Sequence, residues 1–172
     1  MVKILQKDGR ALRLVSKNIP IKDIKSAKVK KIIQDMKDAL DGELDGVAIA
    51  APQIGVNLRL FIISERAFKL SGKSDTEDED MVFINPEIIK KSKETDFMEE
   101  GCLSARWYYG LVKRSKRATV EAFNENGQKF KMGRSGLLAQ IFQHEIDHLD
   151  AVLFTDKAKD LVEIPPQDVP RI

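Results

Sequence analysis

The chain has 172 residues, 42% hydrophobic and 33% charged, which is typical of one soluble globular domain spanning residues 1–172. Its net charge of +2 is too small to indicate a nucleic-acid partner, and no apolar run approaches the roughly 20 residues of a membrane helix. With a single cysteine and no apolar secretory signal at the start, the sequence favours the reducing cytosol.

Helical and extended segments alternate along the first half of the chain. Apolar residues recur at helical spacing over about residues 25–41, which predicts an amphipathic helix. Residues 58–63 and 81–84 predict two strands, and Asn85-Pro86 is expected to end the second. The stretch SGKSDTEDED at 71–80 is too polar to bury and is predicted to be a mobile acidic loop.

The second half of the chain predicts a hairpin, a helix and an extended tail. The densest basic run, 113–117, is expected to be a solvated strand edge. Strands at 118–123 and 128–132 flank an Asn-Gly pair, which is a strong signal for a tight turn. A second helix is expected over about 134–149, and the proline-rich residues 164–172 are expected to be extended.

Both histidines of the chain lie in the stretch QHEIDH within the second predicted helix. His144 and His148 are four residues apart, so they share one helix face with Leu137 and Ile141. One turn separates the imidazoles, and both could bind one metal ion with Glu145 beside it, which is the logic of H-E-x-x-H enzymes. The plain alternative is a helix that is polar on one side.

Two histidines do not complete a catalytic metal site, which usually has three protein ligands. Cys102, in the stretch EEGCLS, is one candidate for the third ligand. A lone cysteine is usually a buried hydrophobe, and nearby carboxylates are expected to raise the pKa of its thiol unless a metal deprotonates it. A cysteine protease using Cys102 and His144 is possible but leaves His148 unexplained. The downstream carboxylates, as in thermolysin-like peptidases, are the other candidates: Asp160, Glu163 and Asp168.

A third unusual stretch is GVAIAAPQIG, residues 46–55. Its small residues allow another backbone to approach closely, and Pro52 stiffens the chain before Gln53. From these residues alone, a core-packed turn and a site loop are equally reasonable interpretations.

Together, GVAIAAPQ, EGCLS and QHEIDHLDAVLF resemble the three motifs of peptide deformylases, in the family's order. FINPEI and GLLAQIFQHE extend the resemblance, which covers the chain up to about Asp160. That family removes the formyl group from the N-terminal formyl-methionine of newly made proteins. The resemblance therefore implies an α+β fold, with mixed or antiparallel β-sheets around a central helix that carries HExxH. It also implies N-formylmethionyl nascent chains as substrates, the ribosome as a candidate partner and no membrane partner.

The resemblance assigns the metal to Cys102, His144 and His148, with water as the fourth ligand. One divalent ion is implied: iron(II) is favoured, and zinc, nickel or cobalt suit the same ligands in purified protein. Glu145 is expected to take the water's proton and return it to the departing amine. The bacterial cytosol is the family's usual place, and an organelle or phage origin would look the same.

By the same resemblance, the side-chain amide of Gln53 and the backbone N–H of Leu103 stabilise the oxyanion of the reaction. The backbone near the start of the small-residue stretch is expected to pair with an extended substrate, and the helix is expected to line a methionine pocket, with core packing as the alternative there. The residues expected to bind substrate are Gly46, Val47, Ala48, Leu137 and Ile141.

The chain departs from the family pattern near these substrate residues. The family usually has glycine at the positions of Ala48 and Ala151, and a Val/Ile-Pro segment where this chain has ARWYY at 105–109. The departures concern substrate preference and turnover more than the chemistry. Two other hypotheses remain: an HExxH metallopeptidase, and a non-catalytic relative that binds nascent chains.

Overall fold

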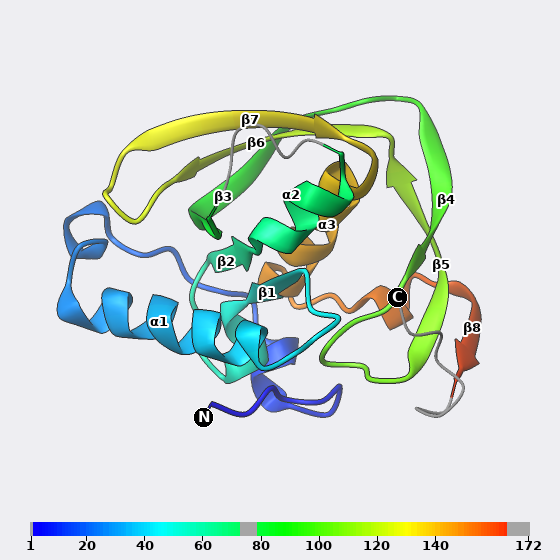
Figure 1. Cartoon of the computed structure of the whole chain (residues 1–172), viewed down its shortest axis with the longest axis horizontal. Helices are drawn as coiled ribbons and strands as arrows, with labels where there is room; N and C mark the ends of the chain where they lie inside the picture. Colours follow the sequence, from blue (N-terminus) through cyan, green and yellow to red (C-terminus); the bar gives the residue numbers. More distant parts are fainter. Residues whose placement is uncertain (1, 73–78, 165–172) are drawn as a thin grey trace.

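The computed structural model describes residues 2–72 and 79–164 (Figure 1). Most of the predicted acidic loop, residues 73–78, lies outside the described residues, and so does the predicted tail from residue 165 onward. Among the helices within the described ranges, none is long and apolar enough to span a membrane.

The described residues form two antiparallel sheets. The first contains five strands in the order β1-β2-β3-β6-β7, and the second contains three in the order β4-β5-β8. The strands are β1 Ala48–Ala50, β2 Leu60–Ile63, β3 Met81–Lys91, β4 Thr95–Glu100, β5 Tyr108–Ser115, β6 Arg117–Phe123, β7 Lys129–Ser135 and β8 Lys159–Glu163. Figure 1 shows the second sheet beside the first, at the end where β4 and β5 curve away from β6 and β7.

Three α-helices and four short 3-10 helices complete the structure. The α-helices are α1 Ala27–Asp41, α2 Glu65–Leu70 and α3 Gly136–Leu149. The 3-10 helices are η1 Arg10–Arg13, η2 Ile21–Asp23, η3 Ala51–Ile54 and η4 Phe154–Asp156. Both long helices fall within the predicted ranges, and Ser26 caps α1 by accepting a hydrogen bond from Val29 N–H.

Alternation along β2 places the two long helices on opposite faces of the large sheet. Leu60 and Ile62 share a hydrophobic cluster with the apolar side of α1, whereas Phe61 and Ile63 share another with α3. In the second cluster, Phe83 lies with ring centroids 4.5 Å from Phe61 and 5.6 Å from Phe142 of α3. The cluster fixes where α3 sits, and truncating such a buried ring to alanine typically costs about 3–5 kcal/mol of stability.

Helix α3 contacts strands of both sheets and is the central element of the molecule (Figure 1). The expected fold class is therefore confirmed: an α+β protein with antiparallel sheets packed around the helix that carries H-E-x-x-H. The only parallel pairing in the described chain is an isolated bridge between Lys17 and Leu58.

The predicted hairpin is confirmed, but the predicted end of one strand is wrong. Strands β6 and β7 pair in register around the Asn-Gly turn. Strand β3 continues past Asn85-Pro86 to Lys91, with a register shift between Ile84 and Glu87. Asn85 adopts φ 50°, and its side chain exchanges two hydrogen bonds with the backbone of Ile19. A bulge held by this contact lets the strand pass a proline that removes one ladder donor.

Candidate metal centre

Cys102, His144 and His148 converge on one point between the two sheets. Their ligand atoms all lie within 4.8 Å of one another, and Cys102 Sγ is 3.2 Å from His148 Nε2. The cysteine follows the end of β4, at a close approach that requires Gly101, because a Cβ there would lie 2.9 Å from the Tyr109 ring. The structure thus brings together the three residues that the sequence suggested as metal ligands.

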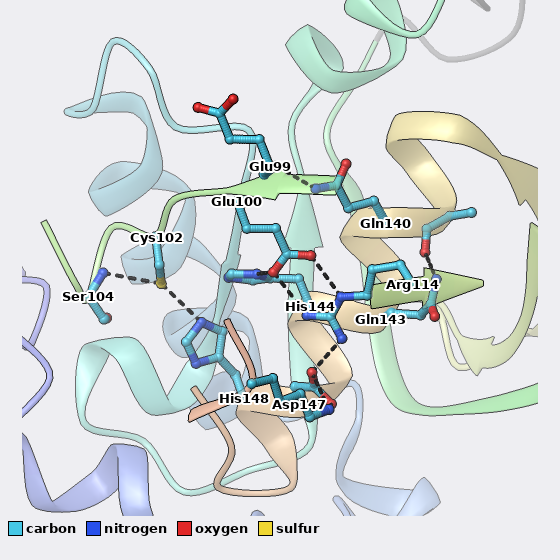
Figure 2. A network of polar contacts seen from close by, with 12 residues as sticks. Glu99, Glu100, Cys102, Ser104, Arg114, Gln140, Gln143, His144, Asp147 and His148 are labelled. Carbon is cyan, nitrogen blue, oxygen red and sulfur yellow. Dashed lines mark hydrogen bonds and ion pairs between the residues drawn. The ribbon is translucent and has the colours of Figure 1, made fainter. Parts of the chain in front are cut away.

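A chain of ion pairs, buried at Glu100 and Arg114 and reaching the surface at Lys157, orients His144 (Figure 2). Its Nδ1 lies 2.9 Å from Glu100 Oε2, and Arg114 donates to both oxygens of Glu100 at 2.7 and 2.9 Å. Arg114 Nη1 also lies 2.6 Å from Asp147, which in turn accepts from Lys157 at 2.7 and 2.8 Å. With Nδ1 held by a carboxylate, Nε2 of His144 is the nitrogen left for a metal.

Glu100 is charged despite its burial. Only 5% of its surface is exposed, which by itself raises the pKa, but the bonds to His144 and Arg114 outweigh burial and lower the pKa to about 2. Breaking a buried pair of this kind by removing one partner leaves an uncompensated charge, which typically costs about 3–5 kcal/mol. The pair is therefore a rigid support for the imidazole.

Sequence reasoning missed this support. Arg114 was expected to belong to a solvated strand edge, but that expectation is wrong for this residue, because it is 4% exposed and paired to Glu100. The one signal in the sequence was the acidic pair before Gly101, of which Glu100 turns inward and Glu99 stays exposed. Arg114 is separated from Glu100 by 14 positions and from Asp147 by 33 positions in the sequence. Contacts between residues this far apart produce no local sequence pattern from which they could be predicted.

The thiol of Cys102 lies in an environment that favours its ionised form. Burial raises its pKa, but the imidazoles of His148 and His144 outweigh burial and hold the pKa well below the usual range. The expectation that neighbouring carboxylates raise this pKa is wrong, because the two imidazoles beside the sulfur stabilise the thiolate. A thiolate beside two imidazoles is a donor set that suits a borderline-soft divalent metal.

Glu145 lies within the same buried space. It is 4% exposed, and its Oε2 has no hydrogen-bond partner among the described residues. Burial, its largest influence, raises the pKa of Glu145 to about 7. A buried carboxyl with a free oxygen and a near-neutral pKa is suited to accept and return a proton. This orphaned oxygen is also independent evidence that the centre fits a metal and its attendant water.

Gln53 points its amide nitrogen at the cysteine. Its Oε1 accepts from Ala50 N–H at 2.8 Å, so Nε2 faces the sulfur of Cys102 at 3.7 Å and the hydroxyl of Ser104 at 3.1 Å. The residue is 2% exposed and sits in η3, directly after β1. Of the two interpretations of the small-residue stretch, the geometry favours a site loop. Ser104, buried beside the amide, was not anticipated from the sequence.

Leu103 directly follows the cysteine in the chain, and its expected role as a backbone donor stays a prediction. Its carbonyl accepts from Gln6 Nε2 at 3.1 Å, and its side chain is 8% exposed. The backbone is therefore fixed on both sides of the metal ligand, by Gln6 at Leu103 and by Tyr109 packing at Gly101.

The residues expected to bind substrate lie on an open edge and on the central helix. Strand β1 is an end strand of the large sheet, and Ala50 N–H bonds a side chain rather than β2. By alternation, the N–H and C=O of Ala48 also face away from β2, while Val47 C=O accepts from Ser64 N–H. Gly46 precedes them, where a Cβ would lie 2.8 Å from Leu40 Cδ1.

On α3, Ile141 is buried and Leu137 is partly buried, and both pack with the cluster around Phe142. Their position one and two turns before His144 was predicted. Core packing accounts for both residues, and their expected contact with a methionine side chain stays a prediction.

The carboxylates proposed as alternative third ligands lie elsewhere. Asp160 and Glu163 are exposed on β8, outside the group formed by Cys102 and the two histidines. Asp168 lies outside the described residues. Cys102 therefore completes the three-ligand set within the part of the chain that the structure describes.

A helix bearing H-E-x-x-H, with a third ligand from another element, defines the class of metal-dependent hydrolases to which this fold and site correspond. The family model for polypeptide deformylase matches residues 1–163. The chain belongs to the polypeptide deformylase family.

Individual relatives agree with this assignment. The chain is 41% identical to Peptide deformylase 2 of Clostridium perfringens, covering 94% of this chain and 96% of that protein. It is 39% identical to Peptide deformylase 2 of Clostridium acetobutylicum, covering 91% and 94%. The crystal structure of a peptide deformylase from Synechococcus elongatus in complex with actinonin matches with a TM-score of 0.78 and 31% identity, covering 92% of this chain and 79% of that one.

Proposed function

We propose that this chain removes the N-formyl group from the N-terminal formyl-methionine of newly made proteins and releases formate. The observation that carries the proposal is the convergence of Cys102, His144 and His148 with an orphaned, buried Glu145 and an inward-pointing Gln53. Membership of the polypeptide deformylase family supports the same reaction.

The proton steps fall to Glu145. A divalent ion held by Cys102, His144 and His148 would supply Lewis acidity and would lower the pKa of a water molecule towards neutral pH, so that the water could lose a proton before attack. Glu145 takes the proton that this water loses and delivers it to the amine nitrogen as the formyl C–N bond breaks. Water and a formamide thus give formate and a free amine. The raised pKa of Glu145, about 7, suits a group that must both accept and release a proton.

Gln53 and Leu103 stabilise the negative charge that develops on the formyl oxygen. The Gln53 amide is held in place by Ala50 N–H, so it needs no reorganisation when the charge appears. Leu103 N–H, on the backbone fixed by Gln6, is the second donor. One such donor is typically worth about 3 kcal/mol of transition-state stabilisation.

The peptide part of the substrate binds as an added strand on the open edge of β1. Ala48 presents its N–H and C=O there, and Gly46 and Val47 lead into the same edge. Main-chain hydrogen bonds do not depend on the identity of the substrate's side chains, which suits an enzyme that must process many different N-termini. Leu137 and Ile141 line the pocket for the methionine side chain in this proposal.

The proposal includes one divalent ion, with iron(II) favoured and zinc, nickel or cobalt accepted by the same ligands. Its partners are N-formylmethionyl nascent chains, met where they leave the ribosome, and its place of action is the cytosol. The metallopeptidase alternative is less supported, because among the described residues the group formed with the two histidines contains Cys102 and no downstream carboxylate.

Formate release from formyl-Met-Ala-Ser tests the proposal directly. Protein purified without oxygen and loaded with iron(II) should release formate, and Glu145→Ala should bind the metal but lose at least about 100-fold in rate, as expected for a lost general base. Absence of formate from folded, metal-loaded wild type would reject the proposed reaction. Equal rates from both proteins would reject the role of Glu145.

A further inference from the structure

One arginine joins the segment that enters β1 to the loop that carries Cys102. Arg106 Nη1 lies 2.6 Å from Asp45 Oδ2, and its Nη2 lies 3.1 Å from Asp45 Oδ1, which is a bidentate pair. The same Nη2 also contacts the carboxylate of Glu43. The Arg106 side chain is 20% exposed, whereas that of Asp45 is 53% exposed. We call these three residues the Arg106 clamp.

On one side, the clamp holds the segment that enters β1. Residues 43–45 lead directly into Gly46 and the strand edge proposed to bind substrate. Burial does not hold this segment, because the side chain of Leu44 is 94% exposed. Its backbone is tied to α2 by Arg66, which donates to the carbonyls of Leu44 at 2.7 Å and Glu43 at 3.0 Å. Arg106 connects the same segment to the loop that carries Cys102, on the side of the metal centre.

On the other side, the clamp is anchored to the loop that carries Cys102. Arg106 N–H donates to Gln6 Oε1 at 3.4 Å, and Gln6 Nε2 donates to the carbonyl of Leu103 at 3.1 Å. Ala105 N–H closes a turn on the carbonyl of Cys102 at 3.0 Å. A change in the position of residues 43–45 relative to the metal ligand must therefore stretch the Arg106 contacts.

Backbone geometry next to Arg106 shows that this loop is held in an unfavourable conformation. Trp107 has φ 71°, a left-handed conformation that costs a non-glycine residue on the order of 1 kcal/mol or more. The Arg106 guanidinium also lies 5.6 Å from the centroid of the Trp107 ring. Such a conformation persists where surrounding contacts determine it, and the paired guanidinium is one of those contacts.

Arg106 neutralises part of the acidic charge at the entrance to β1. One guanidinium faces two carboxylates, so the three clamp residues by themselves carry a net charge of −1, and the guanidinium of Arg66 also lies near Asp45. Removing Arg106 therefore makes this site more negative by one charge. We call the clamp and the adjoining edge of β1 the substrate rim. Both carboxylates are partly exposed, and they lie in the segment that leads into Gly46 and β1. The charge of the incoming peptide's side chains therefore affects binding at this rim. Main-chain pairing at β1, in contrast, does not depend on those charges.

We propose that Arg106 is a positioning and specificity-determining residue, which holds the peptide-binding edge at a fixed distance from the metal centre and shields two carboxylates from the peptide. The proposal rests on the proposed deformylase function, because it concerns how the peptide of that reaction is held. It assigns a role to a residue of the stretch 105–109, one of the places where this chain departs from the family pattern.

Kinetics with peptides of increasing length and changed charge test the proposal. Arg106→Ala should raise KM for formyl-Met-Ala-Ser about five- to tenfold, with kcat within about twofold, as expected for lost substrate positioning at a rim ion pair. KM for formyl-Met-Ala should rise less, because it pairs with less of the edge. The preference for formyl-Met-Ala-Lys over formyl-Met-Ala-Glu should increase about threefold or more and shrink at high salt.

Matched variants separate positioning from general destabilisation. Arg106→Lys keeps the charge but loses the bidentate geometry. It should therefore keep the wild-type charge preference and show a rise in KM smaller than that of Arg106→Ala. Asp45→Asn should raise KM for the tripeptide like Arg106→Ala, while shifting the charge preference in the opposite direction. Arg13→Ala removes an exposed ion pair to Asp156 that shares no residue with the clamp, and should change none of these values.

Amide hydrogen exchange measures the clamp without catalysis. Exchange at residues 43–47 should be faster in Arg106→Ala than in wild type or Arg13→Ala. Unchanged exchange there, or an Arg106→Ala enzyme with wild-type KM and charge preference, would overturn the proposal. If wild type releases no formate, the deformylase function fails while the exchange measurement still decides whether the clamp exists. If Arg106→Ala does not fold, Arg106→Lys and Asp45→Asn carry the same tests.

Discussion

The metal centre and the substrate rim of this molecule are held together in different ways. Around the metal centre, Glu100 and Arg114 are 5% and 4% exposed, and their mutual contacts keep His144 in one orientation. At the rim, Arg106 and Asp45 pair at the surface, where water and salt weaken the attraction. Burial thus keeps the metal centre rigid. The rim is held by exposed contacts, and a single substitution can change their strength.

This difference matches the different demands of catalysis and of peptide binding. In catalysis, a misplacement of about 1 Å at the reacting atoms can cost on the order of 100-fold in rate. Pairing between a peptide backbone and an open strand edge tolerates more variation, because it depends on many weak contacts. Consistent with this, the chain keeps every expected centre residue but departs from the family pattern at Ala48 and over residues 105–109.

The largest effect is expected at Gln53. Gln53→Leu should lower kcat about 100- to 1,000-fold with little change in KM, because the amide donates to charge that exists only in the transition state. Steady-state formate release measures both constants. A thermal melt must accompany it, since the variant also leaves Ala50 N–H unpaired. A change in KM alone would contradict the oxyanion role and would show that Gln53 acts in substrate binding instead.

A smaller effect is expected from the support behind His144. Glu100→Gln should weaken metal binding about 10- to 100-fold, because the amide orients the imidazole less well and no longer matches Arg114. Titration with a competing chelator measures the affinity. The matched control is Glu94→Gln, which removes a surface pair with Lys116 and should leave metal affinity unchanged. Equal affinities in both variants would show that the buried pairs do not support the ligand.

A still smaller effect is expected at the rim itself. Ala48→Gly removes a methyl group from the strand edge and should lower KM for formyl-Met-Ala-Ser by up to about tenfold, the scale of a single methyl or methylene group in a binding site. It should also cost about 0.5–1 kcal/mol of stability, because glycine is more flexible in the unfolded chain. A fall in kcat of the size expected for Gln53→Leu would show that Ala48 belongs functionally to the centre.

The sequence predicted the parts of the site that are local in the chain. Helical spacing placed His144, Glu145 and His148 together and made Cys102 one of several candidates for a third ligand. The assignment of all four residues to a metal site, and the role of Gln53, required the resemblance to a family with three separated motifs. The Arg114 support and the Arg106 clamp could not be predicted, because each depends on the tertiary arrangement of distant segments. Within a basic run or an unfamiliar loop, nothing in the local pattern distinguishes a buried or bridging arginine from a solvated one.

The smallest effect is expected at the end of the helix that carries both histidines. Ala151 follows α3 at φ 62°, a left-handed conformation that glycine adopts without steric cost. Ala151→Gly should therefore raise stability by up to about 1 kcal/mol, once the greater flexibility of the unfolded glycine is subtracted from the relieved strain. For a domain of this size, that corresponds to a rise in Tm of about 2–4 °C.

The matched control for this change is Ala27→Gly, at the exposed start of α1. There the backbone is helical, so glycine should lower stability by up to about 1 kcal/mol. Neither change alters a ligand side chain, and glycine at position 151 keeps the backbone N–H that donates to the carbonyl of His148 at 3.2 Å, so kcat should stay at the wild-type value in both. If Ala151→Gly destabilised the protein as Ala27→Gly does, the left-handed turn would carry no strain. If it altered kcat instead, the end of α3 would have to be counted with the metal centre, whose geometry then depends on more than its buried ion pairs.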